Sequence, residues 1–182
     1  MKRKFSSLVA LLVFVLSAAL LVLSVGRASS YERDDILLVR VARVHDGDTV
    51  SVLIGKRREK VRLIGIDAPE LGQRPWGARA KKRLREMLSV AGRTVRMEFD
   101  VDRRDKYGRL LAYLWTGDRR LINLEMVRDG YAVLFTFPPN IRHVDELRKA
   151  QRFARDRRLG IWGPDGLKEM PVDYRRRHPL KK

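Results

Sequence analysis

Two short acidic segments carry the side chains best suited to hold a metal ion. Residues 46–49 read Asp-Gly-Asp-Thr and residues 67–70 read Asp-Ala-Pro-Glu, and each segment lies at the end of a predicted strand. Loops at strand ends place functional groups on a rigid scaffold. Carboxylate oxygens suit calcium or magnesium, whereas a chain with 3 histidines and no cysteine has few ligands for softer metals. Together the two segments predict a divalent cation held by oxygen atoms.

Each segment also has a purely structural interpretation when it is taken alone. Asp-Gly is a frequent hairpin turn, so residues 46–49 are more often only a turn. Residues 67–70 can be a strand that ends at Pro69 with solvated acids around it. Neither segment identifies a metal site without further support.

Two arginines near these segments are candidates for binding a phosphate. Arg62 lies in a predicted strand shortly before Asp67, and the two side chains point to opposite faces unless a turn or bulge intervenes near Gly65. Arg109 follows residues 105–108, where charged and aromatic side chains precede a glycine. A guanidinium can hold a phosphate through two parallel hydrogen bonds and stabilise charge on a pentacoordinate phosphorus. An isolated arginine is more often part of a surface salt bridge.

The strands that must position these residues are predicted from the alternation of apolar and polar side chains. Turn signals at Asp46-Gly47 and at Gly55 separate the first three strands into a meander. The predicted strands lie within 36–44, 50–54, 61–64, 93–99 and 110–115.

Three helices are predicted from apolar residues at helical spacing. The first runs from Pro75 to about residue 90, the second covers 122–129, and the third covers about 144–157. The first helix is expected to turn one face inward with Ala78, Leu84, Met87 and Leu88, and the third with Leu147, Ala150 and Ala154. Five strands with a helix after the third predict an α+β, mainly β fold, a five-stranded OB-type barrel with about three helices, which often binds nucleic acid.

The two ends of the chain differ in composition from its centre. Basic residues at 2–4 precede an apolar run at 8–25, which predicts a signal peptide or an N-terminal membrane anchor over residues 1–28. Either interpretation predicts an exported protein, secreted or anchored to the outer face of the cytoplasmic membrane. Residues 29–167 are expected to form one domain, and 168–182 a basic, mobile tail.

The net charge of +18 indicates a polyanionic partner such as nucleic acid or anionic lipid. Leaving out Lys2, Arg3, Lys4 and Arg27 still leaves 36 basic and 22 acidic residues, a net charge of +14. An arginine-rich surface is also compatible with a hot habitat. Because there is no cysteine, disulfides and thiol chemistry are excluded.

Three segments in order, 45–49, 61–70 and 105–113, closely resemble the staphylococcal nuclease (thermonuclease) family. The similarity continues through 123–132, 139–147 and 160–162, and so covers nearly all of the expected domain. The resemblance implies an OB-fold barrel and a calcium-activated phosphodiesterase that acts on DNA and RNA. It further implies cleavage between phosphorus and the 5′ oxygen, which leaves 3′-phosphate ends, by a monomer that needs no protein partner.

The resemblance also assigns roles to the chemical residues. Asp48 and Asp67 would bind Ca2+ together with the main-chain carbonyl of Ala68, and Glu70 would hold the attacking water as general base. The phosphate would be clamped by two residues, Arg62 and Arg109. The ligands and the water would be oriented by Asp46 and Thr49. Nucleotide contacts would come from Lys106, Tyr107, Phe135 and Phe137.

The sequence departs from the family at three places near the expected site. Ala68 stands where the family often has threonine, and because the ligand there is a backbone carbonyl, metal binding is expected to survive with changed affinity. Phe135 and Phe137 stand in place of tyrosines, which keeps stacking and loses a hydroxyl, although both rings could instead belong to the core. The loop 71–74 is shorter, so substrate access is expected to differ.

Two other functions fit parts of the sequence. A non-catalytic OB module could bind nucleic acid at the cell surface through charge and stacking, but it would not need three carboxylates and two arginines. A basic envelope protein could bind anionic lipid, with membrane attachment through its N-terminal segment, but this leaves the acidic segments unexplained.

Overall fold

The computed structural model describes residues 36–179. Among these residues no helix is both long and apolar enough to span a bilayer. The leader or anchor predicted over 1–28 lies outside the described residues. The elements, in chain order, are β1 (Ile36–Val44), β2 (Thr49–Ile54), β3 (Arg57–Leu63), β4 (Ile66–Asp67), α2 (Trp76–Val90), β5 (Thr94–Glu98), β6 (Leu110–Trp115), α3 (Ile122–Arg128), β7 (Val133–Leu134), α4 (Val144–Asp156), the 3-10 helix η1 (Gly160–Trp162) and α5 (Pro171–Arg177).

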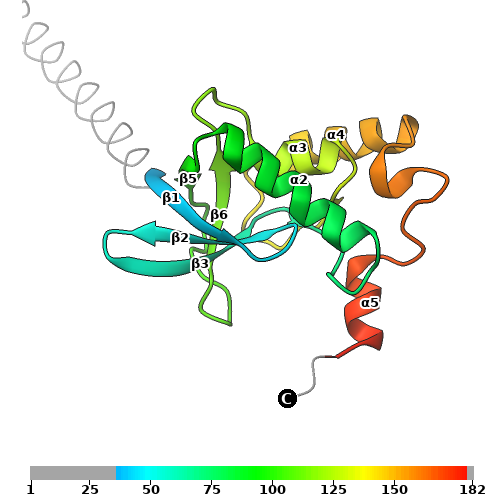
Figure 1. The fold of residues 1–182 in the computed structure, drawn as a ribbon, viewed down its shortest axis with the longest axis horizontal. Coiled ribbons are helices and arrows are strands. Elements are labelled where there is room, and N and C mark those ends of the chain that lie inside the picture. The colour runs from blue at the N-terminus through cyan, green and yellow to red at the C-terminus, as the bar shows by residue number, and fades with distance from the viewer. Residues whose placement is uncertain (1–35, 180–182) are drawn as a thin grey trace, which may run out of the picture. The chain divides into compact units, whose positions relative to one another are not determined.

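Five strands close into a barrel in the order β1-β2-β3-β6-β5, which confirms the predicted OB-type architecture (Figure 1). The pairs β1–β2, β2–β3 and β5–β6 are antiparallel, and β3 runs parallel to β6. The alternation seen in the sequence puts Val50, Val52, Val61 and Leu63 inside, where each is buried. Removal of these apolar surfaces from water is the main stabilising contribution to such a barrel.

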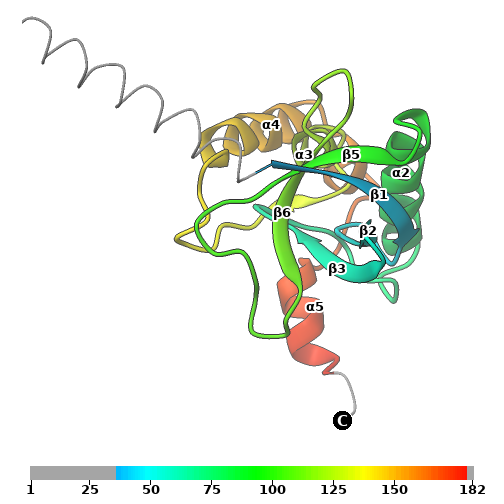
Figure 2. The ribbon, with the colours of Figure 1, turned by 90° about the vertical axis from the view of Figure 1, so that its left-hand side faces the viewer.

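The three predicted helices are present and pack on the barrel (Figure 2). α2 buries Leu84, Met87 and Leu88 as expected, but Ala78 is exposed and Ala80 is buried in its place. The predicted inward face of α4 is confirmed, because its three expected residues are its buried ones, namely Leu147, Ala150 and Ala154. Helix α3 packs against both α2 and α4 and contributes Met126 and Val127 to the same core.

The register of β2 against β3 brings the first acidic segment next to Arg62. Thr49 pairs with Arg62 across the two strands, and Val50 pairs with Val61. The backbone N–H of Leu63 donates to the carbonyl of Asp48 at 2.9 Å. The hairpin therefore fixes Asp48 beside the end of β3.

A tight turn at residues 64–65 changes the direction of the chain between β3 and β4. Gly65 has φ of +78°, a conformation that L side chains rarely adopt. The side-chain amide of Asn123 on α3 is fully buried and donates to the carbonyl of Ile64 at 2.9 Å, which ties the turn to the helix. After the turn, Asp67 in β4 pairs with Val133 in β7. The turn thereby brings the next strand back toward the end of β3.

The C-terminal segment contains a helix that the sequence analysis did not predict. Residues 171–177 form α5, within the tail from residue 168 for which a basic and mobile segment is the expectation. Pro171 is in the first turn, where its missing N–H costs nothing, and it is buried. The last turn carries three arginines, 175–177, which interact favourably with the helix dipole.

The glycine turn can be tested with a matched pair of substitutions. Gly65→Ala is expected to lower the free energy of unfolding by about 1–2 kcal/mol, because an alanine must adopt the positive φ of this position. It should lose about 1–3 kcal/mol more from overpacking, because an added Cβ would lie 2.5 Å from the Leu147 Cδ1. Gly55→Ala has the same sign of φ at +58° but meets nothing within 4 Å, so it should show only the backbone cost. Urea denaturation measures both, and equal losses would contradict the proposed role of Leu147.

Candidate active site

Arg62 joins the two acidic segments. Its Nη2 lies 3.2 Å from the Asp48 Oδ2 and 3.1 Å from the Asp67 Oδ1. Its Nη1 donates to the carbonyl of Leu63 at 2.8 Å. From the sequence, Arg62 and Asp67 are expected to meet only if a turn or bulge lies between them. The structure has a turn at residues 64–65. One guanidinium therefore bridges two carboxylates, one from the turn between β1 and β2 and one from β4.

Asp48 is held in place by its neighbours. The backbone N–H of Ala68 donates to the Asp48 Oδ2 at 2.8 Å, and the Thr49 hydroxyl donates to the Asp48 Oδ1 at 3.0 Å. The Asp46 Oδ1 accepts the backbone N–H of Asp48 at 3.0 Å. Gly47 permits this close approach, because a Cβ there would lie 2.5 Å from the Cβ of Ala68. Asp46, Thr49 and the backbone of Ala68 therefore all contact Asp48.

The carboxylates lie in an environment that disfavours uncompensated negative charge. The Asp67 side chain is only 1% exposed, and burial raises its pKa, with the charge of Asp48 acting in the same direction. Two arginines, Arg62 and Arg175, oppose this effect. Burial and the charge of Asp48 likewise raise the pKa of Asp46 to about 6. Desolvated acids of this kind are stabilised by additional positive charge in their midst.

Glu70 lies on a compact loop directly after the second acidic segment. Its backbone N–H donates to the Gln73 Oε1 at 2.9 Å, and its carbonyl accepts the backbone N–H of Gln73 at 2.8 Å. Gly77 in the first turn of α2 allows the loop to lie close, since a Cβ there would be 2.0 Å from the Glu70 carbonyl oxygen. The Glu70 carboxylate stays partly exposed, so a solvent molecule can reach it.

Arg109 is positioned by Asp105 rather than by the acidic segments. Its Nε donates to the Asp105 Oδ2 at 2.7 Å, and the Asp105 Oδ1 accepts the backbone N–H groups of Tyr107 and Arg109. Burial alone would raise the pKa of Asp105, but the hydrogen bonds from Arg109 outweigh it and lower that pKa. The parallel pairing of Val61 with Leu110 places this loop beside β3. The ion pair uses Nε and does not involve the two terminal nitrogens of Arg109.

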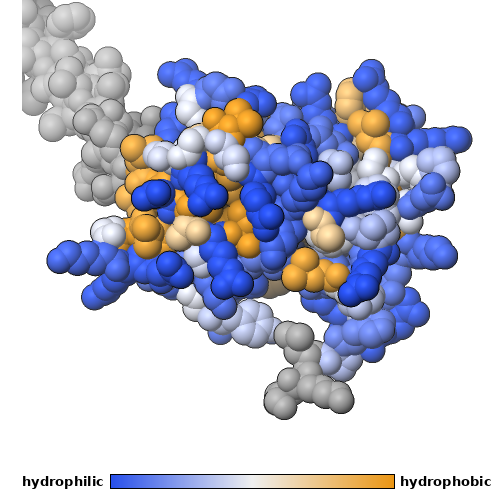
Figure 3. All heavy atoms as spheres, in the orientation of Figure 1, coloured by the Kyte–Doolittle hydropathy of each residue, from blue (hydrophilic) through white to orange (hydrophobic). Residues whose placement is uncertain are grey.

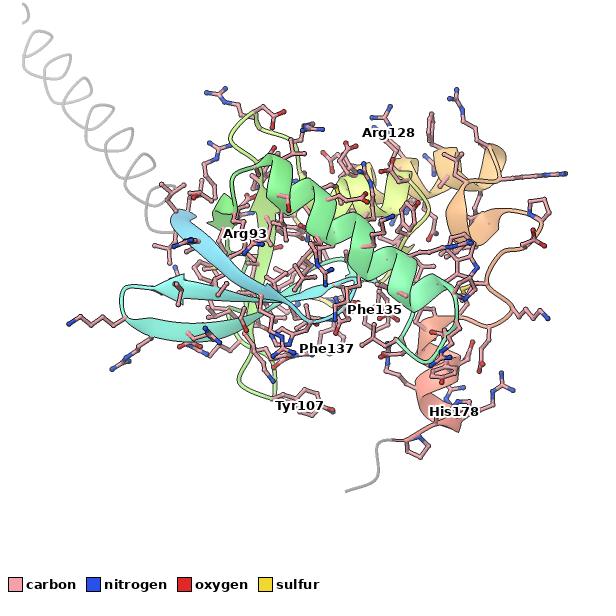
Figure 4. All side chains as sticks on the ribbon, in the orientation of Figure 1. Arg93, Tyr107, Arg128, Phe135, Phe137 and His178 are labelled. Atoms are coloured by element: carbon pink, nitrogen blue, oxygen red, sulfur yellow. The ribbon has the colours of Figure 1, made fainter. Side chains whose placement is uncertain are left out.

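The residues predicted to contact nucleotides are at the surface. Tyr107 and Phe137 are each 73% exposed and Phe135 is 39% exposed, so the alternative that the two phenylalanines belong to the core is wrong. Lys106 places its ammonium over the Tyr107 ring at 5.2 Å, and Figure 4 shows Tyr107 projecting from the lower edge of the molecule. Exposed aromatic faces flanked by cations are suited to stacking on bases.

The donor chemistry of the site fits a hard divalent cation. Among residues 36–179 there is no group of three or more His, Asp or Glu side chains arranged to hold a metal ion as they stand. Instead, the guanidinium groups of Arg62 and Arg175 lie against Asp67. The carboxylates of Asp48, Asp67 and Glu70 carry oxygen atoms of the kind that calcium and magnesium prefer, and the guanidinium of Arg175 lies between Asp67 and Glu70.

Arg175 is the site residue that the sequence analysis missed. It comes from α5, and it contacts both Asp67 and Glu70. Two signals pointed to a helix there: proline at the start of the segment and, after it, Asp173 followed by a run of arginines. Nothing in the sequence indicated that this helix would reach the acidic segments.

Comparison with known proteins places this arrangement in a family. A family described as staphylococcal nuclease homologue matches residues 60–164. The thermonuclease of Staphylococcus intermedius is 36% identical over 141 residues, which cover 75% of this chain and 81% of that protein. The endonuclease YncB of Bacillus subtilis is 33% identical over 148 residues, covering 78% and 69% of the two chains, and the thermonuclease of Staphylococcus hyicus is 32% identical over 128 residues, covering 68% and 74%.

The family match covers the end of β3, strands β5 and β6 and the helices α2, α3 and α4, and it includes Arg62, Asp67, Glu70 and Arg109. The similar proteins carry the names thermonuclease and endonuclease, which favours a hydrolase over a binding module that lacks activity. The chain therefore belongs to the staphylococcal nuclease family and is a nuclease.

Proposed function

We propose that this chain is an exported, calcium-dependent nuclease that hydrolyses phosphodiester bonds in DNA and RNA, breaking the bond to the 5′ oxygen and leaving 3′-phosphate ends. The observation that carries the proposal is the convergence of Asp48 and Asp67 on the guanidinium of Arg62, with Glu70 linked to Asp67 through Arg175. Buried acids that share a single arginine are suited to a second, doubly charged cation. Export is supported by the composition of residues 1–28.

The cation would be held by the carboxylates of Asp48 and Asp67 and by the main-chain carbonyl of Ala68. Calcium in this position would supply Lewis-acid polarisation of a phosphoryl oxygen. Asp46 and Thr49 would keep Asp48 in the orientation required, through the two hydrogen bonds described above. Magnesium shares the preference for oxygen, and calcium is favoured here by the family resemblance.

In the chemical step, the Glu70 carboxylate would accept a proton from water as the water oxygen forms its bond to phosphorus. The bond to the 5′ oxygen breaks, and the leaving oxygen takes a proton from solvent. Arg62 and Arg109 would clamp the phosphate and stabilise its increased negative charge, with Arg109 nearer the leaving oxygen. No covalent intermediate with the protein is required.

Substrate binding would combine charge with stacking. Lys106, Tyr107, Phe135 and Phe137 offer a cation and three exposed rings for nucleotides on either side of the scissile bond. The surrounding surface suits a polyanion, since Figure 3 shows a largely hydrophilic face and the chain carries +18. Charge of this kind raises affinity for single strands in a salt-dependent way.

The dependence on calcium is tested by incubating the purified protein with single-stranded DNA and RNA in calcium chloride, and again with an excess of chelator. Cleavage with calcium and none with chelator is the expected result, and mass spectrometry of the products should find phosphate on the 3′ ends. Intact nucleic acid in both tubes would reject the proposal. Cleavage that continues in chelator would reject its metal dependence.

The assigned roles of Glu70 and Arg109 predict losses of activity without loss of fold. Glu70→Gln should slow cleavage on the order of 10² to 10⁴-fold, because the amide cannot accept the proton. Arg109→Ala should slow it on the order of 10² to 10³-fold, because charge on the phosphate loses a donor.

Matched controls for these variants lie away from the site. Glu86→Gln on α2 and Arg120→Ala in the loop after β6 each change an exposed residue of the same type. Both controls should cleave DNA at the parent rate, and all four variants should keep the parent circular dichroism spectrum. A cleavage rate of Glu70→Gln within about threefold of the parent rate would contradict the role of Glu70 as general base.

A further inference from the structure

The guanidinium of Arg175 occupies the carboxylates that the proposed mechanism needs. Its Nη1 and Nη2 donate to the Asp67 Oδ1 and Oδ2 at 2.9 and 2.8 Å, and Nη1 also lies 2.9 Å from the Glu70 Oε1. Both oxygens of Asp67 are engaged, and Oδ1 accepts a further hydrogen bond from Arg62. A bidentate arginine on a buried carboxylate is among the stronger polar contacts in proteins.

This contact and a bound cation exclude each other. Calcium needs oxygen ligands at about 2.3–2.6 Å, which requires lone pairs of Asp67 that Arg175 now uses. Two positive groups that close to one carboxylate would also repel each other strongly in a partly buried site. The same guanidinium ties up Glu70, the proposed general base. Arg175 therefore blocks cation binding and proton transfer with one side chain.

The segment that delivers Arg175 is docked on the loop that carries Glu70. Gln73 is shared between them, because its Oε1 accepts the N–H of Glu70 and its Nε2 donates to the carbonyl of Glu169 at 2.8 Å. The Tyr174 hydroxyl lies against Gly72, where an added Cβ would be 2.2 Å from it. In Figure 1, α5 lies beside the loop that precedes α2. The placement of Arg175 is thus built by several contacts and does not rest on one ion pair.

The docking of α5 itself is light, which makes it releasable. The helix has 7 residues, and Pro171 is its one buried residue. The Arg175 side chain is 41% exposed, in contrast to the 1% of Asp67. The chain before α5 is anchored more firmly. The indole N–H of Trp76 donates to the carbonyl of Asp165, and the side chains of Leu167 and Met170 pack against the cluster of Trp76 and Ile161. The helix can leave while the segment before it stays attached.

From these contacts we propose that α5 is an autoinhibitory plug: Arg175 takes the place of the catalytic cation on Asp67 and Glu70, and cation binding expels it. The inference rests on the proposed function. The family match ends at residue 164, before α5, so the family match does not include the segment that forms the plug. The protein without the cation is then closed, and it opens when the cation is available.

The test compares calcium affinity in the full chain and in two variants by isothermal titration calorimetry with calcium chloride. Arg175→Gln removes the competing charge and should bind calcium roughly 10- to 100-fold more tightly than the parent, the range that corresponds to one charge-assisted contact. Arg176→Gln is the matched control, because Arg176 lies on the same helix, is 76% exposed, and pairs with Asp173 and not, among the described residues, with Asp67 or Glu70. Its affinity should equal that of the parent. Equal or weaker binding by Arg175→Gln would overturn the plug.

Hydrogen exchange gives a second readout that does not depend on activity. Calcium should speed the exchange of amides in residues 172–178 of the parent, because α5 is released. Exchange in α5 that is unchanged or slowed by calcium would contradict the proposal. No calcium binding by either the parent or Arg175→Gln would overturn both the plug and the calcium site.

Nuclease assays separate this inference from the proposed function. With calcium limiting, Arg175→Gln should cleave single-stranded DNA faster than the parent, and with calcium saturating the two should be equal. Slower cleavage at saturating calcium would mean that Arg175 assists the substrate, which contradicts the plug but leaves the nuclease intact. Tighter calcium binding without cleavage by any variant would reject the catalytic roles and leave the competition between Arg175 and calcium standing.

Discussion

The structure is organised around two buried carboxylates, Asp48 and Asp67, which share one nitrogen of Arg62 at 3.2 and 3.1 Å. Two negative charges in a partly desolvated site repel each other, and a single guanidinium compensates only one of them. Several separate features serve this contact: the hairpin register that sets Asp48 beside β3, the turn at Gly65, and the buried amide of Asn123 that holds the turn. The demand for a further positive charge accounts for both the proposed cation and the contact with Arg175.

Much of the barrel could be predicted from the sequence because its signals are local. Alternation of apolar residues and Asp-Gly or glycine turns identified the strands, and helical spacing identified α2, α3 and α4. The alternation of apolar and polar residues does not predict the contact between Arg62 and Asp67, because this contact depends on the chain reversal at residues 64–65. Ala78 was assigned to the wrong face because its neighbour Ala80 has equal hydropathy, and only the packing against the barrel chooses between them.

The contacts that could not be predicted are those between segments far apart in the chain. The sequence of α5 is short and has no apolar face. The helix meets a distant loop through Tyr174, which lies against Gly72, and the chain just before it does so through the hydrogen bond from Gln73 to the carbonyl of Glu169. Arg175 then competes for the same oxygens that suit a divalent cation. A basic surface that attracts a polyanion thus coexists with a basic side chain that closes the site.

The most direct test of the cation site is a crystal structure of the full chain grown in calcium chloride, with data collected to locate calcium by its anomalous scattering. We predict one calcium peak bound by the carboxylates of Asp48 and Asp67 and the carbonyl of Ala68, with Arg175 no longer on Asp67. A calcium-bound crystal whose peak lies elsewhere, with Arg175 still paired to Asp67 and Glu70, would contradict the assignment of these carboxylates as the cation site.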